Sequence, residues 1–371
     1  MDILVIGDAN HQYNLSFCKW IKKSANCSVS IIDFKSSKIQ KGDYDSFYPL
    51  GGNPKLLNVK WFGSIYRAFL VKRIIKKNKL GNEVVLLQSA IPWTAIISRF
   101  LKNHSHNFTI ALWGSDFYRY KKRRILEKLI SNANNIIIGS PQMITDFDNE
   151  FGKLNLKVNL CYFGNEPMEN LKTLKDKNIT KKESCDALGL DNNYIKVIIG
   201  HNGSIHNKHL EVIESITQSN PEQNYHVILP MTYGANKEYI NEVFNKCKVS
   251  LKKFTILTDF MSEQEVAHLR NISDIMINVQ TTDAFSGSMR EVMFCGGVMI
   301  NGAWLPYDFL TKRGVYFETV DNTEGVGNKI DQIILDFDVF SEKARKNREK
   351  IYELSSWSKT IKAWSKVLIS K

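Results

Sequence analysis

Residues 281–300 contain the side chains whose types and spacing best suit ligand chemistry. Asp283 and Glu291 flank a short stretch rich in Gly and Ser, and an apolar helix-like run follows, ending at Cys295-Gly296. A loop of small residues that leads into a helix presents free backbone N–H groups and the positive end of a dipole, where phosphate commonly binds. An ionised carboxylate such as Glu291 suits the vicinal hydroxyls of a ribose or sugar. The stretch predicts a phosphorylated-sugar site, and the alternative is an acidic loop before an ordinary core helix.

A second candidate phosphate-binding loop follows the strand-like residues 195–199. Gly200 opens a polar loop that carries Lys208 and leads into a helix predicted for residues 210–217. Such a loop, with a cation close to a helix start, is well suited to a diphosphate. Three of its residues are histidines, at positions 201, 206 and 209, but no acid or Cys stands beside them, and we therefore predict no metal site.

These two segments resemble the donor-binding segments of retaining GT-B glycosyltransferases, particularly glycosyltransferase family 4. The family pattern is an acidic residue, seven residues, Glu, and a small-residue helix that ends in Cys-Gly before a strand. Asp283 stands where the family has its first Glu, and Ser286 where it usually has Gly. In the earlier loop Lys208 matches the family's Lys, whereas His201 replaces its Arg.

The resemblance implies a role for each of these residues. Glu291 would hold the ribose, and Asp283 would hold a hydroxyl of the donor sugar. The diphosphate would bind Lys208, His201 and backbone amides at the helix start, and the nucleobase would pack against the loop that contains Phe260. The donor-binding residues would thus be Gly200, His201, Asn202, Lys208, Phe260, Ser286, Gly287, Ser288, Met289 and Glu291.

The first half of the chain offers one further polar candidate, Asp116, in Trp113-Gly114-Ser115-Asp116 after a predicted strand at 108–112. Family 4 often has His-Gly-Ser-Asp here. With Trp113 in place of His, the segment is more similar to the bacterial Fuc4NAc (4-acetamido-4,6-dideoxygalactose) transferases, which act on a lipid-linked acceptor. The resemblance implies catalytic roles for Asp283 and, on the acceptor side, Asp116. Capping of the following helix is an equally good explanation of Asp116.

Two successive series of strand–helix–strand units must position these residues, which predicts an α/β protein. Together with the resemblance, they imply the GT-B fold, in which two Rossmann-like doubly wound domains face a cleft. We expect an acceptor-side domain over 1–167, a linker and lead-in helix over 168–190, and a nucleotide-sugar domain over 191–345. The terminal helix, 346–371, has an apolar stripe, and either it crosses back to the first domain or it packs on its own. The first strand turn lacks the three-glycine dinucleotide fingerprint, so no NAD site is predicted.

Composition sets the limits on partners and location. A length of 371 residues suits two domains, and the net charge of +12 favours anionic partners. Without a recognisable module, the charge alone predicts no nucleic-acid binding. No apolar run is long enough to span a membrane, no signal segment opens the chain, and the six cysteines form no Cys-x-x-Cys pair. We expect a cytoplasmic protein without disulfides.

A basic helix predicted over 61–78 offers a surface for the inner face of the cell membrane. Its apolar face carries Trp61, Ile65, Phe69 and Ile74, and its end is rich in Lys and Arg. A second basic run lies at 119–124. These cations either form solvated helix ends or contact anionic lipid, which would make the protein peripheral to the membrane.

The expected activity is sugar transfer from a nucleotide-sugar donor to a glycan or a polyprenyl-diphosphate-linked glycan, in the synthesis of a bacterial surface polysaccharide. The resemblance implies retention of anomeric configuration and no metal or other cofactor. Two alternatives stay open: a GT-B sugar-nucleotide epimerase, which would consume no acceptor, and a non-catalytic GT-B-like partner protein. The second class typically lacks the phosphate Lys and the ribose Glu, whereas this chain has Lys208 and Glu291.

Overall fold

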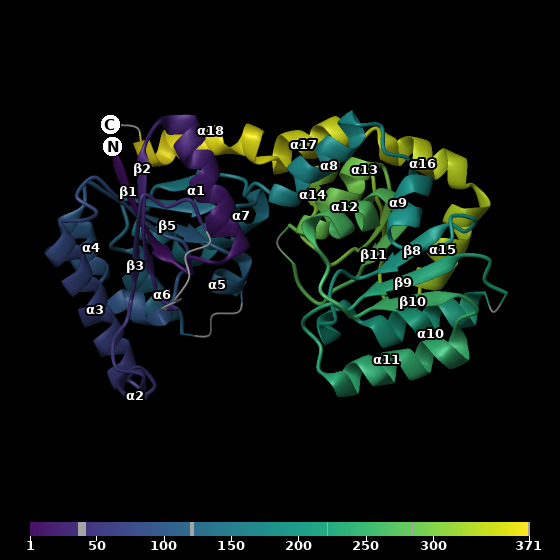
Figure 1. Ribbon diagram of the computed structural model, residues 1–371, viewed down its shortest axis with the longest axis horizontal. Coiled ribbons are helices and arrows are strands. Elements are labelled where there is room, and N and C mark those ends of the chain that lie inside the picture. Colours follow the sequence, from purple (N-terminus) through teal and green to yellow (C-terminus); the bar gives the residue numbers. More distant parts are fainter. Residues whose placement is uncertain (36–41, 119–121, 221, 284, 370–371) are drawn as a thin grey trace. The chain divides into compact units, whose positions relative to one another are not determined.

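A computed structural model of the chain describes residues 1–35, 42–118, 122–220, 222–283 and 285–369. It divides into two compact units, one made of Met1–Asn165 with Ser356–Lys371 and the other of Glu166–Ser355. Each unit is a parallel β-sheet with helices on both faces (Figure 1). The predicted α/β class with two Rossmann-like domains is confirmed.

The first unit contains a seven-stranded sheet in the order β3-β2-β1-β4-β5-β6-β7, with parallel pairing throughout. Its strands are β1 (Asp2–Gly7), β2 (Ser28–Asp33), β3 (Ser46–Pro49), β4 (Val84–Leu87), β5 (Asn107–Leu112), β6 (Asn135–Ile138) and β7 (Val158–Leu160). Its helices are α1 (Gln12–Ala25), α2 (Pro54–Leu57), α3 (Phe62–Asn78), η1 (Pro92–Ile96), α4 (Ser98–His104), α5 (Gly114–Tyr118), α6 (Arg123–Ile130), α7 (Pro141–Phe151), η2 (Gly152–Leu154) and α18 (Trp357–Ile369).

Alternate residues of the central strand β1 build the two halves of this unit's core. Ile3 and Val5 pack with α1 and α18, whereas Leu4 and Ile6 pack with α3, α6 and α7. The division follows from the strand period of two, which sends successive side chains to opposite faces of the sheet. Uninterrupted apolar residues in β1 are therefore what a strand covered on both faces requires.

Helix α18 completes the first unit although it is the last element of the chain. Trp357 and Trp364 are fully buried, and the Trp364 ring lies 5.1 Å from that of Phe17 in α1. The Trp364 indole also donates a hydrogen bond to the carbonyl of Tyr162. The terminal segment expected over 346–371 is two helices, since α17 (Arg348–Ser355) belongs to the second unit.

The second unit contains a six-stranded parallel sheet in the order β10-β9-β8-β11-β12-β13. Its strands are β8 (Lys196–Ile199), β9 (His226–Pro230), β10 (Phe254–Leu257), β11 (Ile275–Asn278), β12 (Val298–Gly302) and β13 (Glu318–Val320). The chain winds outward in opposite directions from β8 and β11. Ligands of such sheets bind outside the carboxyl ends of the strands at this reversal point.

Helices cover both faces of this sheet (Figure 1). They are α8 (Glu166–Asp176), α9 (Lys181–Ala187), η3 (Ile205–Asn207), α10 (His209–Ser219), α11 (Lys237–Ser250), α12 (Glu263–Ile272), α13 (Gly287–Cys295), α14 (Asp308–Thr311), α15 (Val326–Leu335), α16 (Phe337–Arg345) and α17. The segment expected as linker and lead-in helix, 168–190, forms α8 and α9 inside the second unit. Its helices pack on α12.

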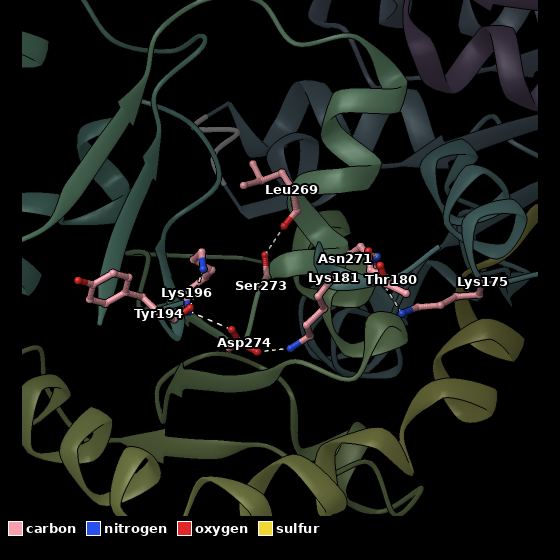
Figure 2. A network of polar contacts seen from close by, with 9 residues as sticks. All are labelled: Lys175, Thr180, Lys181, Tyr194, Lys196, Leu269, Asn271, Ser273 and Asp274. Carbon is pink, nitrogen blue, oxygen red and sulfur yellow. Dashed lines mark hydrogen bonds and ion pairs between the residues drawn. The ribbon is translucent and has the colours of Figure 1, made fainter. Parts of the chain in front are cut away.

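A polar network at the amino ends of β8 and β11 fixes α9 and α12 to the sheet (Figure 2). The carboxylate of Asp274 accepts a 3.0 Å hydrogen bond from the backbone N–H of Lys196 and pairs with Lys181 at the start of α9. Asn271 of α12 accepts a 2.6 Å hydrogen bond from Lys175 and donates to the carbonyl of Thr180. Burial lowers the pKa of Lys196. Because this network lies at the amino ends of the strands, it does not occupy the carboxyl edge of the sheet, where ligands bind.

All six cysteines are buried free thiols. Within the described ranges, no helix is both long and apolar enough to cross a membrane.

Candidate functional site

The loop after β8 has a fixed shape, set by buried hydrogen bonds. The side-chain amide of Asn207 donates to the carbonyl of Asn202 at 3.0 Å and to its Oδ1 at 2.8 Å, and Ser204 N–H donates to the same Oδ1 at 2.9 Å. Gly200 has φ +66°, and a Cβ there would lie 2.9 Å from the Cβ of Asn207. Only glycine tolerates both the positive φ and the close approach of Asn207. Gly200 therefore lets the loop turn back over the end of β8.

Two further loops meet this one at the carboxyl edge of the sheet. Thr281 N–H, after β11, donates a 3.0 Å hydrogen bond to the carbonyl of His206. Trp304, after β12, donates from its indole to the carbonyl of Gln280 at 2.9 Å. The ammonium of Lys208 lies 4.8 Å from the centroid of the Trp304 ring. Lys208 is therefore held over this edge by the cation–π contact.

Helix α13 begins beside these loops. Ser286 is its N-cap, and the Ser286 hydroxyl accepts a 3.4 Å hydrogen bond from Met289 N–H. The expected small-residue stretch thus forms a helix start, at Gly287, with backbone N–H groups that suit an anion.

Glu291, one turn into α13, forms a buried ion pair that the sequence did not reveal. Its Oε2 accepts a 2.8 Å hydrogen bond from Nε of Arg270 in α12, and both side chains are 6% exposed. Arg270 also donates from Nη2 to the hydroxyl of Ser288 at 3.0 Å. The remaining nitrogen, Nη1, is buried and has no hydrogen-bond partner among the described residues. Arg270 thus links Glu291, the predicted ribose ligand, to the start of α13. Its Nη1 can still donate a hydrogen bond to a ligand.

The signal for Arg270 in the sequence is its place on the apolar side of α12, three residues after the buried Ala267. An Arg there must either reach solvent or find a buried partner, because a lone buried charge is too costly. The identity of that partner depends on the packing of α12 on α13, which spacing alone does not show.

His201 lies within electrostatic reach of this pair. Burial and the positive charge of Arg270 lower the pKa of His201 to about 4, and the opposing effect of Glu291 is smaller. The imidazole is therefore neutral near pH 7. Its Nδ1 is buried and lacks a hydrogen-bond partner in the described part of the chain. Where the family pattern has an Arg, this chain thus has a neutral ring, and Arg270 and Lys208 bring the positive charge.

Asp283 is attached to the core by Tyr307, a second residue that sequence reasoning missed. The buried Tyr307 hydroxyl donates to Asp283 and accepts a 3.2 Å hydrogen bond from the side-chain amide of Asn278. Burial first, and the charge of Asp283 next, raise the pKa of Tyr307 well above its usual range. Tyr307 thus stays protonated and orients the half-buried carboxylate.

Two candidates, Phe260 and Asp116, belong to other segments of the chain. Phe260, in the loop between β10 and α12, is 89% exposed. Asp116 belongs to the first unit, where its carboxylate accepts hydrogen bonds from Ala90 N–H at 2.9 Å, Ser89 Oγ at 3.0 Å and Trp113 N–H at 3.3 Å. Burial raises the pKa of Asp116. These bonds join the loops after β4 and β5, which gives Asp116 a structural function whatever else it does.

Metal ligands are not gathered anywhere in the described ranges, where no three His, Cys, Asp or Glu side chains stand close enough to share an ion. The cluster at the second sheet can instead present two cations, a helix start and oriented carboxylates. Such a set can bind an anion together with hydroxyl groups.

Solved structures that are similar over the whole chain show that it has the GT-B fold. Sucrose-phosphate synthase from Thermosynechococcus elongatus is similar with a TM-score of 0.78 at 12% identity, over 99% of this chain and 98% of that chain. A glycosyltransferase from Rickettsia africae has a TM-score of 0.72 at 14% identity, over 100% and 99% of the two chains. HepE from Anabaena has a TM-score of 0.72 at 14% identity, over the full length of both. At these identities the likeness establishes the fold alone.

Sequence comparison supplies the family. No protein with curated function matches the chain. The model of a family described as 4-alpha-L-fucosyltransferase, glycosyl transferase group 56, matches residues 57–276, more than half of the chain, which therefore belongs to this glycosyltransferase family.

Proposed function

We propose that the protein transfers a 6-deoxygalactose-type sugar from a nucleoside diphosphate carrier to a hydroxyl of a polyprenyl-diphosphate-linked glycan. The pathway would be the synthesis of a bacterial surface polysaccharide at the inner face of the cell membrane. The sugar class has two supports. The family description names fucose, which is 6-deoxygalactose, and the segment around Asp116 resembles transferases of a 4-acetamido derivative of the same skeleton.

The observation that carries this proposal is that Arg270 bonds to the first turn of α13, while Lys208 lies over Trp304 at the carboxyl edge of the same sheet. A diphosphate placed there would accept hydrogen bonds from the amides of Ser286–Met289 and from the unused Nη1 of Arg270. His201 would contribute a hydrogen bond rather than charge.

The nucleotide carrier follows from the same cluster. Glu291, paired with Arg270, would hold the ribose, because an ionised carboxylate accepts hydrogen bonds from vicinal hydroxyl groups. The Anabaena HepE structures contain UDP and UDP-glucose, which makes UDP one of the bases to test here. The exposed ring of Phe260 would cover a nucleobase.

In the reaction, the bond from the sugar carbon to the diphosphate oxygen breaks, an acceptor hydroxyl oxygen bonds to that carbon, and the hydroxyl proton passes to the departing diphosphate. Negative charge builds on the departing diphosphate, and Arg270, Lys208 and the α13 amides would stabilise it without a metal. Asp283, oriented by Tyr307, would bind a hydroxyl of the sugar, and Asp116 would act from the acceptor side. Retention of anomeric configuration is part of the proposal, on the family 4 likeness of residues 195–305.

The test is a transfer assay with purified protein, a polyprenyl-diphosphate-linked glycan and 6-deoxyhexoses carried on UDP, GDP or dTDP. We expect one donor to give a product heavier by one deoxysugar, with the rate unchanged by EDTA. The anomeric proton coupling of product and donor compares their configurations. Transfer of ordinary hexoses but of no 6-deoxy sugar would refute the sugar class, and loss of turnover in EDTA would refute the metal-free reaction.

A further inference from the structure

Helix α3 packs on the core mainly through residues other than Trp61, Ile65 and Phe69. Its buried residues are Gly63, Ala68, Leu70, Val71 and Ile75. Of the predicted apolar face, Trp61 is 73% exposed and Ile65 and Phe69 are each 56% exposed, whereas Ile74 is half-buried against the core. The helix is apolar on two sides, and the core uses only one of them.

These exposed side chains stand close together in the chain and recur at helical spacing. Phe62, Ile65 and Phe69 follow one another at helical spacing, and they are preceded by the exposed Leu56 of α2 and Val59 of the α2–α3 connection. Single exposed apolar residues are ordinary, but contiguous apolar patches mark sites that contact another apolar phase.

The charge around this patch has a single sign. Between Asp45 and Glu83 the chain has eight Lys and Arg residues and no Asp or Glu. Lys72 and Lys76 continue the stripe of Ile65 and Phe69 at spacings of three and four, and both are exposed. From α6's N-cap, the Lys122 ammonium lies 5.3 Å from the centroid of the Trp61 ring. One stripe thus changes from apolar to cationic along its length.

We propose that α2 and α3 form a docking element for an anionic lipid bilayer. Trp61, Phe62, Ile65 and Phe69 would enter the boundary between headgroups and acyl chains, while Lys72 and Lys76 would contact anionic headgroups. An aromatic and aliphatic patch beside exposed cations has the composition of interfacial membrane helices. A nucleic acid would use the cations but gain nothing from the apolar residues. The inference deepens the proposed function, which has a lipid-linked acceptor.

The test is co-sedimentation of the full chain with vesicles of phosphatidylcholine, alone or mixed with phosphatidylglycerol, at low and high salt. We expect binding to the mixed vesicles that weakens as salt rises. Trp61→Ser with Phe69→Ser should weaken it roughly tenfold or more. Lys72→Gln with Lys76→Gln should weaken it by about fivefold per charge.

Matched controls come from the second unit. Leu335→Ser with Val339→Ser replaces apolar residues that are 84% and 54% exposed, and Lys248→Gln with Lys312→Gln removes two exposed cations. Both double variants should bind vesicles as the wild type does. Because all changed residues are exposed, unchanged melting temperatures should accompany them.

No vesicle binding, or binding that survives Trp61→Ser with Phe69→Ser, would overturn the proposal. Equal binding to vesicles and to soluble heparin, dependent on the cations alone, would show a polyanion surface instead. The assay needs neither donor nor acceptor, so its failure would leave the sugar-transfer proposal untouched. A protein that binds vesicles but transfers no sugar would contradict the sugar-transfer proposal and leave the membrane-docking proposal untouched.

Discussion

Arg270 and Glu291 are the residues whose chemistry most needs an explanation. Burying two charges costs several kcal/mol per ion, and apolar pairs of similar size often serve a fold equally well. Stability therefore gives little reason for this pair. A ligand that bonds to Glu291 and to Nη1 of Arg270, which has no hydrogen-bond partner among the described residues, gives a better one.

Glu291→Ala should destabilise the protein and abolish donor binding. It leaves Arg270 buried and unpaired, which we expect to cost about 3–5 kcal/mol in the free energy of unfolding. The double variant Arg270→Met with Glu291→Leu removes both charges, so its stability should return to near the wild-type value while donor binding stays lost. Urea denaturation and titration calorimetry measure the two properties separately. A double variant that binds nucleotide-sugar with wild-type affinity would rule out the pair as donor ligands.

Three histidines of the second unit should make its stability depend on pH. Burial lowers the pKa values of His201, His209 and His226 to about 4, from about 6.5 in an unfolded chain. Between these values the unfolded state binds more protons than the folded state. Stability is therefore fully present above about pH 6.5 and is lost as the pH falls towards 4.

The free energy of unfolding, measured at several pH values, tests this directly. In His226→Gln the fall between pH 6.5 and 4 should be shallower than in the wild type, because one titrating group is gone. Parallel curves for the two proteins would mean that His226 titrates alike in the folded and unfolded states.

At the scale of elements, the loop 200–208 must hold its shape for Lys208 and His201 to face one ligand. Asn207→Ala removes the buried hydrogen bonds to Asn202 and costs about 1–3 kcal/mol, which should weaken donor binding by about ten- to hundredfold. Asn245→Ala, at an exposed position of α11, is the control and should bind normally. Calorimetry gives both affinities, and equal values would show that the loop does not depend on Asn207.

Much of this element structure could be predicted from the sequence. The strands predicted at 195–199 and 108–112 are confirmed as β8 and β5, and the basic helix predicted over 61–78 as α3, because each depends on neighbours in the chain. Strand β3 was missed, since four residues at a sheet edge give almost no periodic signal.

Only those parts of the candidate site that depend on neighbouring residues in the chain could be predicted. The loops after β8 and β11 show their glycines, Lys208 and Glu291 in the sequence. Arg270 and Tyr307 arrive from other elements by packing, which residue spacing does not record. Similarly, a helix with two apolar faces does not reveal which face the core will take, and α3 is such a helix.

On the scale of the whole molecule, the last helix of the chain, α18, packs into the core of the first unit. Trp364→Ala should destabilise that unit by about 3–5 kcal/mol, because it leaves a cavity beside Phe17. Amides of β1–β7 should then exchange hydrogen faster, while amides of β8–β13 keep their protection. Trp61→Ala, at an exposed Trp of the same unit, should change neither set. Unchanged exchange in β1–β7 of Trp364→Ala would show that α18 is dispensable.

The most direct test of the central claim is titration calorimetry of the purified protein with UDP, GDP, dTDP and ADP in the presence of EDTA. We expect one diphosphate to bind and Lys208→Ala to weaken that binding by about 10- to 100-fold, the value of a charge-assisted hydrogen bond. Lys248→Ala should leave it unchanged. A folded protein that binds none of the four, or binds one equally well without Lys208, would contradict a nucleotide-sugar site at the second sheet.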